Sequence, residues 1–91
     1  MMKKTFSIIV KGIVQGVFYR KYAREKATQL GITGEVRNTS DGDVHIVATG
    51  NEAQLKDFVD YCNAGPETAV VSDVQVEEVS LKEFTAFKIV R

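Results

Sequence analysis

The chain of 91 residues contains no tryptophan and only one each of proline, histidine and cysteine. A lone cysteine cannot form an internal disulfide or a cysteine-rich zinc site. Positive and negative side chains cancel at 12 each, so no overall field attracts nucleic acid or anionic lipid. The first apolar run is broken by Ser7 and ends at Lys11, shorter than a secretory signal or a membrane span of about 20 residues. We therefore expect a cytoplasmic protein without metal, nucleic-acid or membrane partners.

The remaining composition is that of an ordinary globular domain. Apolar residues make up 44% and charged residues 26% of the chain. A chain of this length supports one hydrophobic core and has no room for a second. We expect residues 1–91 to form a single domain and the protein to be a monomer.

Hydrophobic periodicity predicts the order of the elements. Apolar residues alternate in strands and recur every three or four residues in helices. These patterns predict a strand before residue 12, a helix from 19 to Gly31, a hairpin with its turn at 40–43, a helix between Asn51 and Gly65, and strands over 70–76 and 87–90. This is a ferredoxin-like β-α-β-β-α-β sandwich of the α+β class with an added C-terminal strand. Its two helices cover one face of a mostly antiparallel sheet.

The junction between the first strand and the first helix, Gly12 to Arg20, lacks the usual helix N-cap. No Ser, Thr, Asp or Asn lies there, although such a side chain normally accepts a hydrogen bond from the first helical amides. Arg20 and Lys21 instead bring two cations to the positive end of the helix dipole. Free amides, a glycine that permits close approach and an arginine predict a phosphate or carboxylate site. The alternative is an ordinary turn at Gly16, with hydrated amides and a solvated Arg20.

Asn38 is predicted to lie at the same edge of the sheet. In the split β-α-β arrangement the first two strands are parallel with the third between them, so their C-terminal ends share one edge. Two inter-strand spacings, on the order of 10 Å, separate these ends. Asn38 has the parity of Val36 and faces the helices, so we expect it to converge with Arg20 on a small anion. The alternative is a turn or strand-end asparagine.

Two blocks of sequence resemble the acylphosphatase family. Gly12 to Arg20 matches its signature, Gly-x-Val-Gln-Gly-Val-x-x-Arg, and Gly34 to Gly42 is similar to its second block, Gly-x-Val-x-Asn-x-x-Asp-Gly. The resemblance implies a hydrolase that converts an acyl phosphate into a carboxylate and inorganic phosphate, without metal or cofactor. By motif position, Arg20 binds the phosphate and Asn38 orients the attacking water. The implied cradle consists of the main-chain amides of Gln15, Gly16, Val17, Phe18, Tyr19 and Arg20.

Glu35 departs from the family pattern, which commonly carries an aromatic residue, often tryptophan, at this position. Its parity turns it away from the core, so we expect an effect on access or on selectivity for the organic part of the substrate. Asp41 is interpreted as a turn residue, His45 as a lone strand histidine facing away from the site, and Cys62 as a core residue.

Other functional classes share this topology. An RNA-recognition module would carry aromatic stacking residues on its third strand, and residues 44–48 contain none. A small-ligand regulatory domain would use the turn for binding only and is usually fused to an enzyme. The chain also resembles the acylphosphatase-like segment of hydrogenase-maturation carbamoyltransferases, to which further domains are attached. The presence of both Arg20 and Asn38 in a chain of this length favours the free-standing enzyme.

Overall fold

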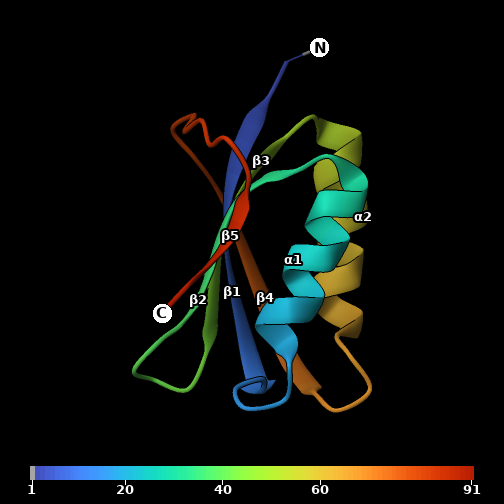
Figure 1. The fold of residues 1–91 in the computed structure, drawn as a ribbon, viewed down its shortest axis with the longest axis vertical. Helices are drawn as coiled ribbons and strands as arrows, with labels where there is room; N and C mark the ends of the chain where they lie inside the picture. Colours follow the sequence, from blue (N-terminus) through green and yellow to red (C-terminus); the bar gives the residue numbers. More distant parts are fainter. Residues whose placement is uncertain (1) are drawn as a thin grey trace.

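The computed structural model describes residues 2–91 and contains a five-stranded sheet covered on one face by two helices (Figure 1). The strands are β1 (Lys4–Ile13), β2 (Thr33–Asn38), β3 (Val44–Gly50), β4 (Val70–Val79) and β5 (Phe87–Val90), and the helices are α1 (Tyr19–Leu30) and α2 (Glu52–Ala64). The predicted element order and α+β ferredoxin-like class are confirmed.

The sheet has the order β4-β1-β3-β2-β5. β3 pairs antiparallel with both β1 and β2, so β1 and β2 run parallel on either side of it, as the sequence predicts. The added strand, β5, pairs parallel with β2 at the outer edge. As a result, the loop after β1 and the hairpin turn after β2 lie at the same end of the molecule, the lower end of Figure 1. The loop between α2 and β4 comes to this end as well.

The core lies between the sheet and the helices. The alternating residues Ile8 and Val10 of β1 and Ile46 of β3 are fully buried beneath the helical stripe that includes Leu55 and Phe58. Burial of side chains of this size stabilises a fold by about 1.5–3 kcal/mol each. The sheet and its core therefore form a rigid support for the loops at the lower end.

The two helices begin in different ways. In α2 the side chain of Asn51 accepts from the amide of Gln54, and the Gln54 side chain accepts from the Asn51 amide, both at 2.8 Å. This capping box satisfies two of the free amides of the first turn. α1 has no side-chain cap at its first residue. The difference predicted from the sequence is therefore present, and it marks the start of α1 as the unusual helix end.

Candidate active site

The loop that connects β1 to α1 contains two residues with positive φ. Gly16 has φ 72° and Phe18, which immediately precedes α1, has φ 63°. No heavy atom lies within 4 Å of the position that a Cβ on Gly16 would occupy, so the space above this glycine is open. The first turn of α1 contains no acidic residue. An anion seated above Gly16 would meet unpartnered amides and the positive end of the helix dipole.

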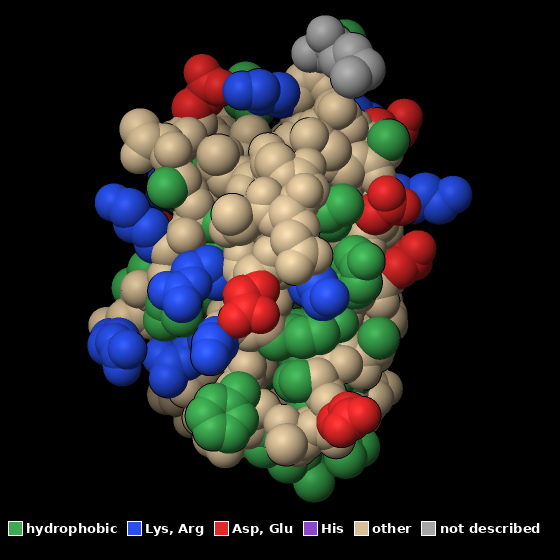
Figure 2. Space-filling model, turned by 45° about the vertical axis from the view of Figure 1, so that its right-hand side comes forward, with side chains coloured by type: hydrophobic (Ala, Val, Ile, Leu, Met, Phe, Trp, Pro, Cys, Tyr) green, Lys and Arg blue, Asp and Glu red, His purple; other side chains and the backbone are tan. Residues whose placement is uncertain are grey.

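Arg20 and Asn38 line a single cavity of about 370 Å³ beside this loop. Arg20 comes from the first turn of α1, and Asn38 comes from the end of β2. Lys21 and Arg91 add two further cations to the lining, which contains no acidic side chain. Lys and Arg side chains also gather at the lower left of Figure 2, on the α1 side of the molecule. The cavity therefore favours an anion.

The amide oxygen of Asn38 is buried and has no hydrogen-bond partner among the described residues. An unsatisfied buried acceptor costs about 1–3 kcal/mol. Native proteins contain few such groups, and those that persist need an explanation such as a catalytic role or an unseen water. Here the uncompensated oxygen belongs to a side chain that lines the same cavity as Arg20.

The side chain of Gln15 connects the loop to the hairpin between β2 and β3. Its Nε2 donates to the carbonyl oxygens of Thr39 and Asp43, both at 2.8 Å. These bonds fix the position of the loop relative to the end of β2, where Asn38 lies. Sequence reasoning assigned only the main-chain amide of Gln15 to the site and missed this bridge. The one sequence feature that could have indicated this bridge was the glutamine of the motif.

A second connection joins the loop to the segment between α2 and β4. The hydroxyl of Thr68 donates to the carbonyl oxygen of Val17 at 2.6 Å. No sequence signal marked Thr68. Val17 itself is half-buried and packs against the core, so the loop is held from two sides.

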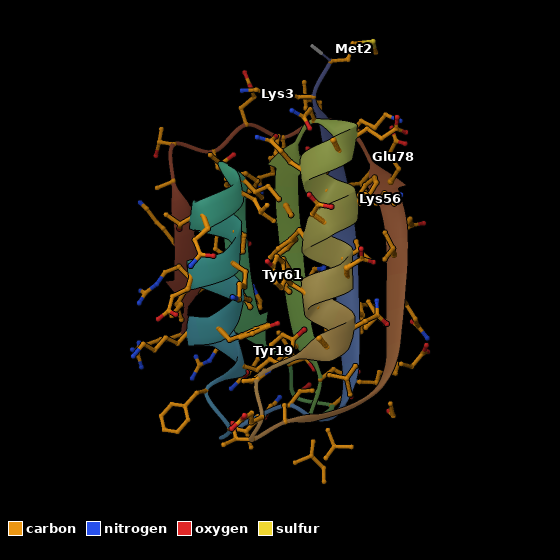
Figure 3. The ribbon with its side chains drawn as sticks, turned by 90° about the vertical axis from the view of Figure 1, so that its right-hand side faces the viewer. Met2, Lys3, Tyr19, Lys56, Tyr61 and Glu78 are labelled. Carbon is orange, nitrogen blue, oxygen red and sulfur yellow. The ribbon has the colours of Figure 1, made fainter. Side chains whose placement is uncertain are left out.

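Tyr19 anchors the base of α1. It is 1% exposed, and its hydroxyl donates to the carbonyl oxygen of Cys62 at 2.6 Å. The labelled Tyr19 lies at the lower end of the two helices (Figure 3). Burial raises the pKa of Tyr19 above its ordinary value, so the residue stays neutral. Burial likewise raises the pKa of the Cys62 thiol to about 12. The structure thus buries Cys62 in the core, as the sequence predicts.

Three other titratable residues near the hairpin, Lys11, Asp43 and His45, have structural partners. Nζ of Lys11 lies 2.8 Å from a carboxylate oxygen of Asp43, and this hydrogen bond and charge raise the pKa of Lys11. His45 Nε2 lies 2.9 Å from the hydroxyl of Ser7. Its neighbours in β3, Val44 and Ile46, are buried beneath the helices, so His45 faces the other side of the sheet. None of these groups lines the cavity.

The residue that departs from the family pattern also has a partner outside the cavity. An oxygen of Glu35 lies 2.8 Å from Nη2 of Arg37, on the face of β2 opposite Val36 and Asn38. Within residues 2–91 no group of three or more His, Cys, Asp or Glu side chains could hold a metal ion. Over the same residues, neither helix has the length and apolar character required to cross a bilayer.

Comparisons with known proteins agree with these features. A family model described as "Acylphosphatase" matches residues 6–89. An acylphosphatase from Marinobacter nauticus is 49% identical over 82 residues, which cover 89% of each chain. One from Vibrio parahaemolyticus is 40% identical and is matched over 98% of this chain and 99% of its own. A crystal structure of acylphosphatase from Bacillus subtilis superposes with a TM-score of 0.94 at 37% identity, covering 99% of this chain and 100% of that one.

Proposed function

This chain belongs to the acylphosphatase family and hydrolyses acyl phosphates, and from that premise we propose which residues do the chemistry. Arg20 and the loop amides from Gln15 to Arg20 bind the phosphoryl group. Asn38 orients the water that attacks it. No metal ion takes part.

Arg20 suits the phosphoryl group because its planar guanidinium can donate two parallel hydrogen bonds to two oxygens. Its position on the first turn of α1 brings this fork next to the uncapped amides. The substrate's charge is distributed over three phosphoryl oxygens, which a cradle of amides and one guanidinium can engage together. Lys21 and Arg91 strengthen the field that draws the anion into the cavity.

The observation that carries the proposal is that Asn38, whose buried amide oxygen has no partner, lines the same cavity as Arg20. A side-chain amide can accept a hydrogen bond from a water through its oxygen and donate through its nitrogen. Rotation of the terminal amide exchanges the two groups, so either can face the cavity. A water held in this way stands ready to attack a phosphoryl group that is bound by Arg20.

The reaction itself needs little further help from the protein. The water oxygen forms a bond to phosphorus as the bond from phosphorus to the acyl oxygen breaks, and the carboxylate leaves with the electron pair. A carboxylate is a stable leaving group, so no strong general acid is required. The cavity lining contains no Asp, Glu or His to serve as base. A phosphoryl oxygen of the substrate therefore takes the water's proton, and catalysis consists of positioning and charge stabilisation.

The alternative of binding without turnover, as in a small-ligand regulatory domain, agrees less well with the site. An anion-binding loop with Arg20 alone would serve that purpose. The unpartnered amide oxygen of Asn38 favours the enzyme, because binding of the phosphate alone needs no group that orients water.

We also propose that the protein is a single-domain, cytoplasmic monomer.

Replacement of Arg20 by lysine tests the phosphate assignment. Arg20→Lys keeps the charge and loses the bidentate geometry, so we expect kcat/KM for an acyl phosphate to fall about 100-fold or more. Competitive inhibition by inorganic phosphate should weaken as well. Arg24→Lys, on an exposed turn of the same helix, is the matched control and should behave as the unmodified protein. Near-normal kinetics in Arg20→Lys would remove Arg20 from the site.

A further inference from the structure

A second cavity adjoins the phosphate cavity. It has a volume of about 390 Å³, lies between the first turns of α1 and the loop before β4, and is lined by Phe18, Lys21, Tyr22, Glu25 and Pro66. Phe18 and Lys21 line both cavities, so the two are adjacent and share a border at these side chains. Asn38 lines only the first. A ligand held at the phosphate loop can therefore extend past Phe18 into the second cavity.

The second cavity differs from the first in charge and in wall chemistry. The phosphate cavity carries three cations and no acidic residue. In the second cavity Lys21 is balanced by Glu25, and the remaining walls are two aromatic rings and a proline ring. Such walls favour a flat, apolar and uncharged group.

Phe18 has no evident structural reason to be aromatic. Its φ of 63° belongs to the left-handed region, where a residue with a side chain costs roughly 1–2 kcal/mol. Its side chain is 74% exposed and so contributes little to the core. A large apolar side chain held at the common border of two cavities is placed to contact a ligand, because neither the backbone nor the packing requires it there.

The opposite wall of the second cavity is held in place before any ligand binds. The hydroxyl of Tyr22 donates to the carbonyl oxygen of Tyr61 at 2.9 Å, and its ring centroid lies 5.9 Å from that of Tyr19. The loop that carries Pro66 is tied to the phosphate loop by the bond from Thr68 to Val17. A preformed cavity binds a ligand with little loss of conformational freedom.

The geometry of phosphoryl transfer indicates which part of the substrate extends there. The attacking and leaving oxygens lie roughly in line through phosphorus. With the water at Asn38, the acyl group must leave on the side away from Asn38, and the second cavity is the neighbouring space that Asn38 does not line. We propose that this cavity is an acyl subsite that binds a flat, apolar acyl group, such as a benzoyl group. This inference rests on the proposed roles of Arg20 and Asn38.

The test compares benzoyl phosphate with acetyl phosphate, whose methyl group is too small to fill the subsite. Tyr22→Ala removes one wall and should lower the ratio of kcat/KM for benzoyl phosphate to that for acetyl phosphate by roughly five- to tenfold. Tyr22→Phe keeps the ring and loses only the bond to Tyr61, so the ratio should be retained. Tyr61→Ala is the matched control, because Tyr61 also packs on Lys26 but does not line the subsite.

NMR of the unmodified protein provides a measurement that does not depend on how the variants fold. Phenylphosphonate should shift the ring signals of Tyr22, whereas methylphosphonate should leave them in place and shift only signals of the phosphate loop, which includes Phe18. Equal effects of the two phosphonates on the Tyr22 ring, or an unchanged ratio in Tyr22→Ala, would overturn the subsite. If Arg20→Lys hydrolyses both substrates normally, the proposed function itself fails. If Arg20→Lys loses activity as proposed but the tests at Tyr22 fail, the subsite is wrong and the proposed function stands.

Discussion

Replacement of Asn38 by alanine should separate activity from stability. An asparagine that orients water matters in the transition state far more than in ground-state binding, so kcat should fall about 100-fold or more. KM and competitive inhibition by phosphate should change little, since Arg20 and the loop amides provide the ground-state binding. A structural asparagine would behave in the opposite way, losing stability first and activity only with the folded fraction.

The expected change in stability follows from the hydrogen bonds that Asn38 does not make. Removal of its unpartnered buried oxygen should recover about 1–3 kcal/mol. Truncation of a half-buried side chain also removes packing contacts, at a typical cost of about 1 kcal/mol. The free energy of unfolding should therefore stay unchanged or rise by up to about 2 kcal/mol. For a domain of this size that is a rise in Tm of between zero and about 16 °C.

The assay pairs steady-state kinetics with thermal unfolding of the same preparation. Val36→Ala is the control, because Val36 lies two residues earlier on the same face of β2 and is fully buried. Loss of its two methyl groups should lower stability by about 2 kcal/mol and leave kcat of the folded protein nearly normal. The two variants should thus show opposite patterns from neighbouring positions on one strand.

Two results would refute this reasoning. Retention of kcat in Asn38→Ala would show that another group orients the water. A fall in Tm like that of Val36→Ala, with activity lost in proportion to the folded fraction, would make Asn38 a structural strand-end residue. Either outcome would leave the phosphate-binding role of Arg20 standing, because that role is tested separately.

Three further predictions concern metal dependence, the loop and the thiol. Hydrolysis of benzoyl phosphate should proceed unchanged in excess chelator, and a loss of activity that Mg²⁺ or Zn²⁺ restores would contradict the proposed mechanism. Gln15→Ala removes two hydrogen bonds to the hairpin, so it should lower the free energy of unfolding by about 1–3 kcal/mol and reduce kcat in the folded protein. Urea unfolding and steady-state kinetics of the same variant measure these two quantities, and normal values of both would show that the two hydrogen bonds do not hold the loop in place. The Cys62 thiol, buried and with its pKa raised to about 12, should resist iodoacetamide at pH 8 until the protein unfolds, and rapid labelling of the native protein would show that the thiol is accessible.

The sequence was sufficient for the elements and for the prediction that Arg20 and Asn38 lie at the same cavity. Strand alternation and helical spacing depend on local chemistry, and so does the capping box of Asn51 and Gln54. The meeting of Arg20 with Asn38 followed from topology, because parallel strands separated by a third must end at one edge of the sheet. These inferences required only the direction in which each side chain points.

The contacts that hold the loop could not be predicted in the same way. The side chain of Gln15 reaches main-chain carbonyls of the hairpin, and Thr68 reaches the carbonyl of Val17. Main-chain acceptors carry no residue signature, and their positions depend on the path of two loops in space. The cavity beside Tyr22 was missed for the same reason, since its walls come from α1 and from a loop far along the chain.

Several local costs meet at the start of α1. The helix lacks a cap, which is worth about 1 kcal/mol. Phe18 has a positive φ, Arg20 and Lys21 are near the positive end of the helix dipole, and a buried oxygen of Asn38 lacks a partner. In the proposed mechanism a bound phosphoryl group satisfies the amides and the cations, and the attacking water satisfies the amide of the asparagine. Under this proposal the same features that destabilise this end of the free protein become favourable contacts in the transition state, which is the condition for catalysis by differential binding.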